Sequence, residues 1–372
     1  MMNVGMVGCG MVAERQYLPA CGALSSLNLV ACADLHPERA EAFCRKAAEE
    51  NCGTPETCTF EEMLARDDID LVMNLTNPKA HFALNRQALD AGKHVYAEKP
   101  LAVTREEGQQ LVELAARKGV QLGCAPDTFL GSSHQTARAL LDSGTIGTPT
   151  AAVLSMVGGG PDGYHDDADL FFQRGAGPLM DNGVYPLTNA VNLLGPVRRV
   201  SAMTKITFPE RTILKEKRYG EKFKVEVPTH VTAVLEFENG VLGTFINSFD
   251  VKGAHHVPRL EIYGTEGSLA MGDPNSFNGA PEIALAADRK AGWQAREETH
   301  GYGGRYRGVG GAELANAVAA GRPARASGEL AYHVLDICCS IYEAADSGRC
   351  VEVQSRVERP DPLPEGVVDD MV

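Results

Sequence analysis

The sequence predicts a two-domain α/β protein. Residues 1–124 are expected to form a doubly wound parallel sheet, and residues 125–372 an α+β domain with a large, open, mainly antiparallel sheet. Three observations predict this fold. A short apolar strand runs into a glycine-rich turn near the N-terminus, and strand-like and helix-like segments then alternate up to about residue 124. Beyond that point, apolar strands are joined by short turns.

The glycine-rich turn is the segment GCGMVA at residues 8–13, which follows the apolar residues 4–7. It fits G-x-G-x-x-A, one form of the Rossmann dinucleotide fingerprint. We expect Gly8 to make the tight turn and Gly10 to let the backbone approach a pyrophosphate at the N-terminus of the next helix. Gly8, Gly10, Met11 and Val12 are therefore predicted to bind a cofactor. A glycine turn without a ligand is the alternative, and the rest of the chain decides between them.

The alternation of elements predicts where other ligand-binding residues lie. The TFEE segment at 59–62 and the TREE segment at 104–107 match the capping box that opens a helix. In a doubly wound sheet, ligands bind beyond the carboxyl ends of the strands. The strands are expected at residues 28–33, 69–75, 94–97 and 120–124, and the helices at 11–24, 78–91 and 104–118.

Asp34 follows the second predicted strand and lies in the position of the acid that binds the adenosine ribose hydroxyls. A carboxylate there would repel a 2′-phosphate, so the sequence favours NAD over NADP. The alternative is an Asp that caps the helix beginning near Pro37. The glycine turn upstream favours ribose binding.

Composition excludes several classes of protein. The chain has 372 residues, with 44% hydrophobic and 23% charged residues and a formal net charge of −14. The negative charge argues against nucleic acid or an anionic membrane as a partner. No apolar run approaches the roughly 20 residues of a membrane span. The 10 cysteines include no C-x-x-C pair, so we expect reduced thiols in a cytoplasmic protein and no metal site.

Lys99 lies at the carboxyl end of a buried strand, between Glu98 and Pro100. A lysine there could polarise a substrate oxygen, or it could be a solvated turn residue, and spacing alone does not choose. Asp181 and Tyr185 are four residues apart at the start of a predicted helix, since Pro186 is expected only in a first turn. They could form an acid–base pair, although an N-capping Asp and a core Tyr are favoured without other information.

The second half of the chain has the pattern of an open sheet. Residues 231–249 predict a hairpin around Asn239-Gly240, and residues 259–271 predict another. A broad sheet needs one face covered, by its own helices, the first domain or another subunit. We therefore expect a homo-oligomer, a dimer or tetramer, formed through this sheet. Residues 201–227 are expected to form a solvated hairpin, and residues 359–372 an acidic tail.

Taken together, these motifs resemble the Gfo/Idh/MocA family, which includes glucose–fructose oxidoreductase and inositol dehydrogenase. The resemblance rests on the fingerprint, Asp34, TNPKAH at 76–81, AGKHVYAEKP at 91–100 and GPLMDNGVYPLT at 177–188, with weaker support from IYGTEGSL at 262–269. It implies an NAD(P)-dependent oxidoreductase that acts on sugars, cyclitols or glycosides. It also implies cofactor contacts from further residues: Arg39, Thr76, Asn77, Pro78, His81, Glu98 and Lys99.

The resemblance assigns the catalytic roles. Lys99 matches the lysine that lies between nicotinamide and substrate, and Asp181 matches the Asp of the second-domain motif. Tyr185 replaces the His of many members, so a phenol with an ordinary pKa near 10 stands in for an imidazole near 6.5. A neighbouring cationic Lys99 would lower the phenol pKa. We expect Lys99 to polarise the reacting oxygen, Tyr185 to exchange the proton, and Asp181 to orient the sugar hydroxyl or the tyrosine.

Two segments bear on substrate choice. Many members have an Asn-Arg pair where this chain has Ala125-Pro126-Asp127-Thr128, so a substrate cannot be transferred from the best-known members. Asp127, Lys99, Asp181 and Tyr185 are expected to contact substrate. The segment GGGPDGYHDDAD at 158–169 is either a substrate loop that presents Tyr164 and His165 or a solvated glycine-rich loop.

The expected activity is hydride transfer between a nicotinamide and a hydroxyl or keto carbon of a sugar. Three alternatives remain open on the sequence. One is a redox glycosidase that keeps its NAD. Another is a ketoreductase acting on a nucleotide-linked sugar. The third is a non-catalytic NAD-binding regulator.

Overall fold

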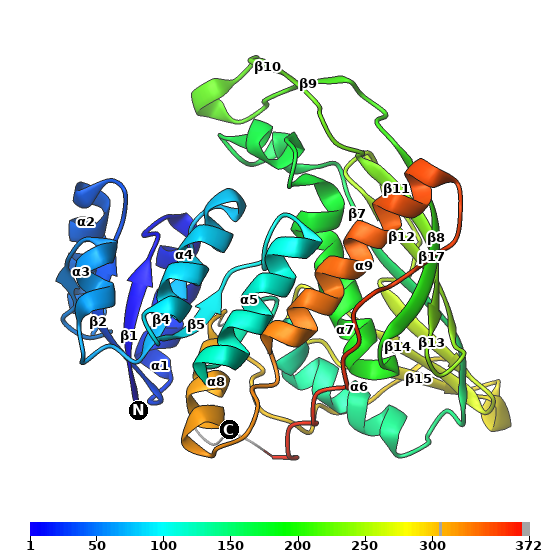
Figure 1. Ribbon diagram of the computed structural model, residues 1–372. Coiled ribbons are helices and arrows are strands. Elements are labelled where there is room, and N and C mark those ends of the chain that lie inside the picture. The colour runs from blue at the N-terminus through cyan, green and yellow to red at the C-terminus, as the bar shows by residue number, and fades with distance from the viewer. Residues whose placement is uncertain (305–306, 367–372) are drawn as a thin grey trace. The chain divides into compact units, whose positions relative to one another are not determined.

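The computed structural model describes residues 1–304 and 307–366, and the chain divides into two compact units (Figure 1). The first unit contains Met1–Gln135, Thr299–Tyr332 and the chain from Pro360 onward. The second contains Thr136–Glu298 and His333–Arg359. The first stretch of the first unit extends to Gln135, beyond the predicted boundary at residue 124, and two later segments of the chain also belong to this unit.

The first unit is built on a six-stranded parallel sheet with the order β3-β2-β1-β4-β5-β6, which confirms the doubly wound prediction. The strands β4, β5 and β6 are almost wholly buried because helices flank the sheet, whereas the two residues of the edge strand β3 are exposed. The strands are β1 (Met2–Val7), β2 (Leu27–Ala33), β3 (Glu56–Thr57), β4 (Leu71–Asn74), β5 (His94–Ala97) and β6 (Leu122–Cys124).

The helices of this unit begin where the sequence signals placed them. Thr59 forms a reciprocal capping box with Glu62, and the Thr104 hydroxyl accepts the Glu107 N–H at 3.2 Å. Gly119 ends α5 in the left-handed conformation. The helical segments are η1 (Ala13–Tyr17), α1 (Leu18–Ala23), α2 (Pro37–Glu49), α3 (Phe60–Ala65), α4 (Pro78–Asp90), α5 (Arg105–Lys118) and η2 (Thr128–Leu130).

Helix α8 (Val309–Ala319) is the main late segment of the first unit. It lies close to the sheet because Gly310 and Gly311 leave room: a Cβ on Gly310 would meet the Tyr96 hydroxyl at 2.5 Å, and one on Gly311 would meet the Met73 Cε at 2.1 Å. The C-terminal segment also packs, since Leu363 is buried and its N–H donates to Gln135 at 2.8 Å. The predicted acidic tail is therefore wrong up to residue 366, and residues 367–372 lie outside the described chain.

The second unit contains a nine-stranded sheet with the order β16-β15-β14-β13-β7-β12-β11-β8-β17. Only the β7–β12 pairing is parallel among its described ladders, so the mainly antiparallel prediction is confirmed. Both predicted hairpins form. The strands are β7 (Pro149–Val157), β8 (Val197–Lys205), β11 (His230–Phe237), β12 (Leu242–Ser248), β13 (Leu260–Gly264), β14 (Gly267–Met271), β15 (Glu282–Leu285), β16 (Gln294–Ala295) and β17 (Val351–Glu352).

Helices lie along one side of this sheet, where α7 contacts β7 (Figure 1). The long helices are α6 (Ser132–Asp142), α7 (Val184–Leu194) and α9 (Gly328–Ser347), and the division between the two units falls inside α6 and α9. The shorter helical segments are η3 (Pro161–Gly163), η4 (Ala168–Phe172), η5 (Leu179–Gly183), η6 (Glu216–Arg218) and η7 (Ala286–Asp288).

Helices α1 and α7 each contain a proline in the first turn, and a π-helical turn directly precedes each helix. η1 lies before Pro19, and η5 lies before Pro186. In a regular α-helix a proline ring clashes with the carbonyl four residues earlier, and a widened turn relieves that clash. Because α7 begins at Val184, Pro186 lies in its first turn, as expected.

An arm formed by β9 (Glu210–Thr212) and β10 (Lys222–Lys224) projects from the second unit (Figure 1). Its outer residues are exposed, but Arg211 is 5% exposed. The Arg211 guanidinium pairs with Asp162 and Asp250, each at 2.6 Å, and stacks on Phe172. A hairpin with exposed outer residues forms as predicted, and Arg211 is an exception because it is buried and fastens the arm to the unit.

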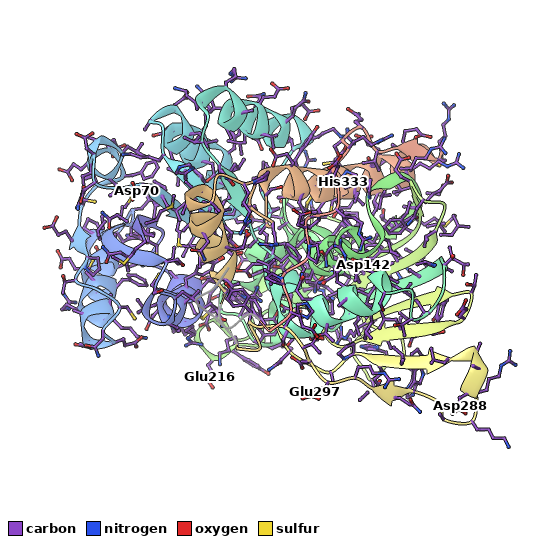
Figure 2. All side chains as sticks on the ribbon, turned by 90° about the horizontal axis from the view of Figure 1, so that it is seen from below. Asp70, Asp142, Glu216, Asp288, Glu297 and His333 are labelled. Carbon is purple, nitrogen blue, oxygen red and sulfur yellow. The ribbon has the colours of Figure 1, made fainter. Side chains whose placement is uncertain are left out.

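His333 on α9 is fully buried in the second unit (Figure 2). Its Nε2 accepts the Val197 N–H at 3.0 Å, so Nδ1 carries the proton that is shared with the Ser355 hydroxyl at 2.8 Å. Burial lowers the pKa of His333 to about 4, with Asp336 opposing and Arg356 adding to the effect. The folded protein therefore holds a neutral imidazole.

Lowering the pH should destabilise the fold through His333. Between pH 6.5 and about 4, the unfolded chain binds a proton at this residue that the folded chain does not. Its contribution is complete above pH 6.5 and is lost as the pH falls, by up to about 1.4 kcal/mol per pH unit. Urea titrations across this range should give a shallower pH dependence for His333→Gln, by about one proton. Identical slopes would contradict the assignment.

Candidate functional site

The glycine turn between β1 and η1 has the geometry expected of a phosphate-binding loop. Gly8 has φ +93°, and a Cβ there would lie 2.8 Å from the Thr76 nitrogen. Gly10, by contrast, is exposed and has nothing within 4 Å of the place of a Cβ. Met11 and Val12 at the start of the helix are 47% and 40% exposed. An anion could therefore approach the free N–H groups of this helix end.

Asp34 lies next to that turn. Its Oδ2 accepts the Cys9 N–H and its Oδ1 accepts the His36 N–H, both at 2.9 Å. The carboxylate is half-buried at the end of β2, while Arg39 is exposed in the first turn of α2. The bond from Cys9 thus holds the predicted ribose-binding acid beside the predicted phosphate turn. The bond from His36 is an Asx-type turn bond, which is consistent with the alternative in which Asp34 caps the helix.

The turn after β4 contains Thr76, Asn77 and Pro78, which are half-buried or exposed. His81, predicted to touch the cofactor, is instead fully buried on α4. Its Nδ1 lies 2.7 Å from the Pro100 oxygen and its Nε2 3.1 Å from the Thr76 oxygen. Burial lowers the pKa of His81. The ring therefore ties together the turns after β4 and β5, and a direct cofactor contact remains a prediction without structural support.

The Glu98-Lys99-Pro100 turn follows β5. Glu98 is 8% exposed, and its Oε2 accepts the Lys99 N–H at 2.9 Å. Lys99 itself is half-buried, and the Lys99–Pro100 peptide is cis. The carboxylate thus fixes the backbone of the lysine that the sequence singled out.

Tyr17 contacts the Glu98-Lys99-Pro100 turn, and it was not identified from the sequence. It is fully buried in η1, and its hydroxyl donates to Glu98 Oε1 at 2.8 Å. Burial, reinforced by the Glu98 charge, raises the pKa of Tyr17. The helix that follows the glycine turn is thereby joined to the turn that carries Lys99. The signal in the sequence that could have identified Tyr17 is a tyrosine hydroxyl on an otherwise apolar helix face.

Replacing Tyr17 with phenylalanine should lower the free energy of unfolding by about 1–3 kcal/mol, because a buried carboxylate oxygen loses its donor. Urea denaturation would measure the loss. Tyr96→Phe is the matched control: Tyr96 is equally buried, its ring lies 6.5 Å from that of Tyr17, and its hydroxyl lies near Asp127. Equal losses in the two variants would contradict a specific Tyr17–Glu98 bond.

In the second unit, Asp181 and Tyr185 lie where the chain changes from η5 into α7. Asp181 is half-buried within the π turn, and Tyr185 is 4% exposed one turn later. The neighbouring Asn182 accepts a bond from Asn247 on β12 at 2.7 Å, and Asn189 donates to the backbone carbonyl oxygen of Tyr185 at 3.2 Å. The start of this helix is therefore fixed to the sheet, and both candidate residues occupy it as predicted.

The segment 158–169 is an ordered part of the second unit. Arg211 donates to the Gly159 oxygen at 3.0 Å and pairs with Asp162, which fixes the loop at two points. Tyr164 is 68% exposed. His165 packs edge-on against Phe171 at 4.9 Å, and its Nδ1 accepts the Asp167 N–H. The loop is tethered to the unit, and the two alternatives for it, a substrate loop and a solvated loop, both stay predictions.

Two family models match the chain. The model described as "Oxidoreductase family, NAD-binding Rossmann fold" matches residues 2–125, and that of the GFO/IDH/MocA C-terminal domain matches residues 134–270. The chain belongs to the Gfo/Idh/MocA family. Both halves of the predicted resemblance are thereby confirmed.

Individual members of the Gfo/Idh/MocA family differ in how much of the chain they match. A dTDP-3,4-didehydro-2,6-dideoxy-alpha-D-glucose 3-reductase of Saccharopolyspora spinosa is 35% identical over 54% of this chain, and the match spans only 59% of the reductase. A D-xylose 1-dehydrogenase (NADP(+)) of Haloferax volcanii is 27% identical over 95% of this chain and 100% of its own length. The structure of levoglucosan dehydrogenase with NADH has a TM-score of 0.81 at 22% identity, covering 95% and 99% of the two chains.

Asp127 occupies the place where many Gfo/Idh/MocA members have an Asn-Arg pair, and we expected it to contact substrate. It is fully buried, and its Oδ2 accepts the N–H groups of Gly308 and Gly310 at 2.8 and 3.0 Å. N–H groups at a helix N-terminus have no partner within the helix, and Asp127 supplies one for these two at the start of α8. Asp127 therefore holds the start of α8 in place, and because the side chain is fully buried, its contact with substrate stays a prediction without structural support.

No helix among the described residues is both long enough and apolar enough to cross a membrane.

Proposed function

We propose that the protein catalyses reversible hydride transfer between NAD and a hydroxyl or keto carbon of a sugar, cyclitol or glycoside. The observation that carries the proposal is the open glycine turn with the Asp34 carboxylate beside it, in a chain of the Gfo/Idh/MocA family. The likeness to sugar dehydrogenases and reductases supports a carbohydrate substrate.

The residues of the first unit fit a dinucleotide. The exposed helix start at Gly10, Met11 and Val12 would hold the pyrophosphate, and Asp34 would accept bonds from the ribose hydroxyls. A carboxylate at the ribose disfavours a 2′-phosphate, so we propose NAD, although the xylose dehydrogenase relative is named for NADP. When bound, the nicotinamide would supply or accept the hydride.

We assign the proton chemistry to three side chains. Lys99, held through its own N–H by Glu98, would polarise the reacting oxygen. Tyr185 would give or take the hydroxyl proton, and Asp181 would orient the sugar or the phenol. Tyr164 and His165 lie on the loop that Arg211 fastens, and we propose that this loop contributes to substrate selection.

The test is to mix the full chain with NAD or NADP and a panel of sugars, cyclitols and glycosides while recording NADH absorbance and released sugar. We expect NADH to form with at least one substrate, with higher kcat/KM for NAD than for NADP. Sugar release without net NADH would replace the proposal with a redox glycosidase. Bound NAD without turnover in either direction would leave a non-catalytic regulator.

A ketoreductase that consumes NADH is the second candidate, because the reductase from Saccharopolyspora spinosa is named for a nucleotide-linked keto-sugar. Oxidation of NADH by dTDP-linked keto-sugars, together with inactivity toward free sugars, would favour it.

We also propose a cytoplasmic homo-oligomer that forms through the second unit's sheet. Met203, Val234 and Leu242 are 81%, 51% and 52% exposed, and their register in β8, β11 and β12 places them on one face. An apolar sheet face of this kind is typical of a subunit interface.

A further inference from the structure

Four cysteines of the first unit gather around the carboxyl end of β2. Cys9 lies in the glycine turn, Cys32 in β2, Cys44 in α2, and Cys58 follows β3. The Cys9 thiol donates to the Ala33 oxygen at 3.6 Å, and the Cys58 thiol to the Cys32 oxygen at 4.0 Å. The part of the chain that the structure describes contains no group of three or more His, Cys, Asp or Glu able to hold a metal ion.

The strand register brings two of these thiols together. Cys32 in β2 and Thr57 in β3 are partners in the parallel ladder, so their side chains point to the same face of the sheet. Helix α2 packs on both strands, and the Thr57 hydroxyl donates to the Cys44 sulfur at 3.5 Å. Because Cys32 is the ladder partner of Thr57, the Cys32 and Cys44 side chains lie near one another in the gap between strand and helix.

The two thiols differ in protonation and in access. The neighbouring Cys32 thiol, the Thr57 hydroxyl and the Arg45 charge lower the pKa of Cys44 to about 6, against the opposing effect of burial. The neighbouring Cys44 and Cys9 thiols, together with burial, raise the pKa of Cys32. Cys44 is half-buried while Cys32 is fully buried. At neutral pH, Cys44 is thus the accessible thiolate, and Cys32 is the protonated thiol behind it.

We propose that Cys44 is a peroxide-reactive modification site and that Cys32 is its resolving thiol. The Cys44 sulfur attacks one oxygen of hydrogen peroxide, so that an S–O bond forms, the O–O bond breaks, and the departing hydroxide takes up a proton to become water. The Cys32 sulfur then attacks the Cys44 sulfenic acid. An S–S bond forms, the S–O bond breaks, and the hydroxide leaves with the Cys32 proton as a second water.

The balance is two thiols and one peroxide giving one disulfide and two waters. The peroxide is the oxidant, and the thiol pair loses two electrons. The expected disulfide joins β2 to α2 directly around Asp34, which lies between these elements. We therefore expect oxidation to weaken NAD binding, a consequence that rests on the proposed function, whereas the modification itself does not.

The experiment treats the reduced full chain with hydrogen peroxide at pH 7 and analyses its peptides by mass spectrometry, with dimedone to trap sulfenic acid. Wild-type protein should yield a Cys32–Cys44 disulfide. Cys32→Ala should instead accumulate dimedone on Cys44, and Cys44→Ser should yield neither product. Cys350, an exposed thiol, is the internal control and should react more slowly.

Measuring the oxidation rate of each cysteine as a function of pH distinguishes specific oxidation of Cys44 from general oxidation of surface thiols. The rate at Cys44 should be half-maximal near pH 6. Comparable rates at Cys44 and Cys350, or a disulfide to Cys9 or Cys58 instead, would overturn the proposal. If the disulfide forms and the Kd for NAD stays unchanged, the modification site holds and its effect on cofactor binding is refuted.

Discussion

Lys99→Met should lower kcat by about 10²–10³-fold while the Kd for NAD changes little. The substitution keeps the length of the side chain but removes the charge that we assign to the developing oxyanion, and loss of one such donor typically has an effect of this size. Because the interaction strengthens in the transition state, kcat and kcat/KM should fall together. Initial rates with the best substrate of the panel, alongside NAD titration by fluorescence, measure both quantities.

Lys118→Met is the matched control for this variant. Lys118 lies at the end of α5 in the same unit and donates to the Asp90 oxygen at the surface. We expect wild-type activity from it, and Lys99→Arg should fall between the two because it keeps the charge but not its position. A Lys99→Met enzyme within threefold of wild type would remove Lys99 from the reaction.

Tyr185→Phe should lower kcat by about 10²–10⁴-fold, the range typical of a lost general acid–base group. The side chain is 4% exposed and the substitution removes one oxygen without opening a cavity, so the fold should persist. The pH profile of kcat should also lose the limb that the phenol contributes. Steady-state rates from pH 6 to 10 check the size of the loss and the shape of the profile.

Tyr342→Phe controls for the loss of a buried hydroxyl in the same unit, since the Tyr342 hydroxyl has no hydrogen-bond partner among the described residues. It should retain full activity. Should Tyr185→Phe turn over at the wild-type rate with an unaltered profile, the residue would revert to the core tyrosine that the sequence pattern alone favoured.

The fold of the first unit could be predicted because each of its signals is local. Capping residues such as Thr59 and Thr104 satisfy their own helix, and apolar strands between turns are buried wherever they pair. Gly8 needs its backbone conformation in any context, since φ there is +93°. The position of Asp34 could be predicted because one strand–helix–strand unit has a characteristic length, which places an acid at the end of the second strand. Such features need no knowledge of distant residues.

The contacts that could not be predicted are those in which a residue's partner is far away in the chain. Asp127 reads as a loop carboxylate, yet it binds N–H groups 181 and 183 residues later. Arg211 reads as a surface charge, yet Asp162 and Asp250 enclose it. Nothing within a few residues of either position indicates burial, because the cost of burying a charge is offset only by groups that the fold supplies.

By itself, the sequence determined the doubly wound sheet, the glycine turn, Asp34 and the position of Lys99, because short-range periodicity and turn chemistry specify them. Tertiary structure decided what surrounds these residues. It placed Tyr17 against Glu98 and Cys32 against Cys44, and it returned α8 to the first unit. Each of these contacts joins segments that only the packing of helices on a sheet brings together, and local sequence carries no record of that packing.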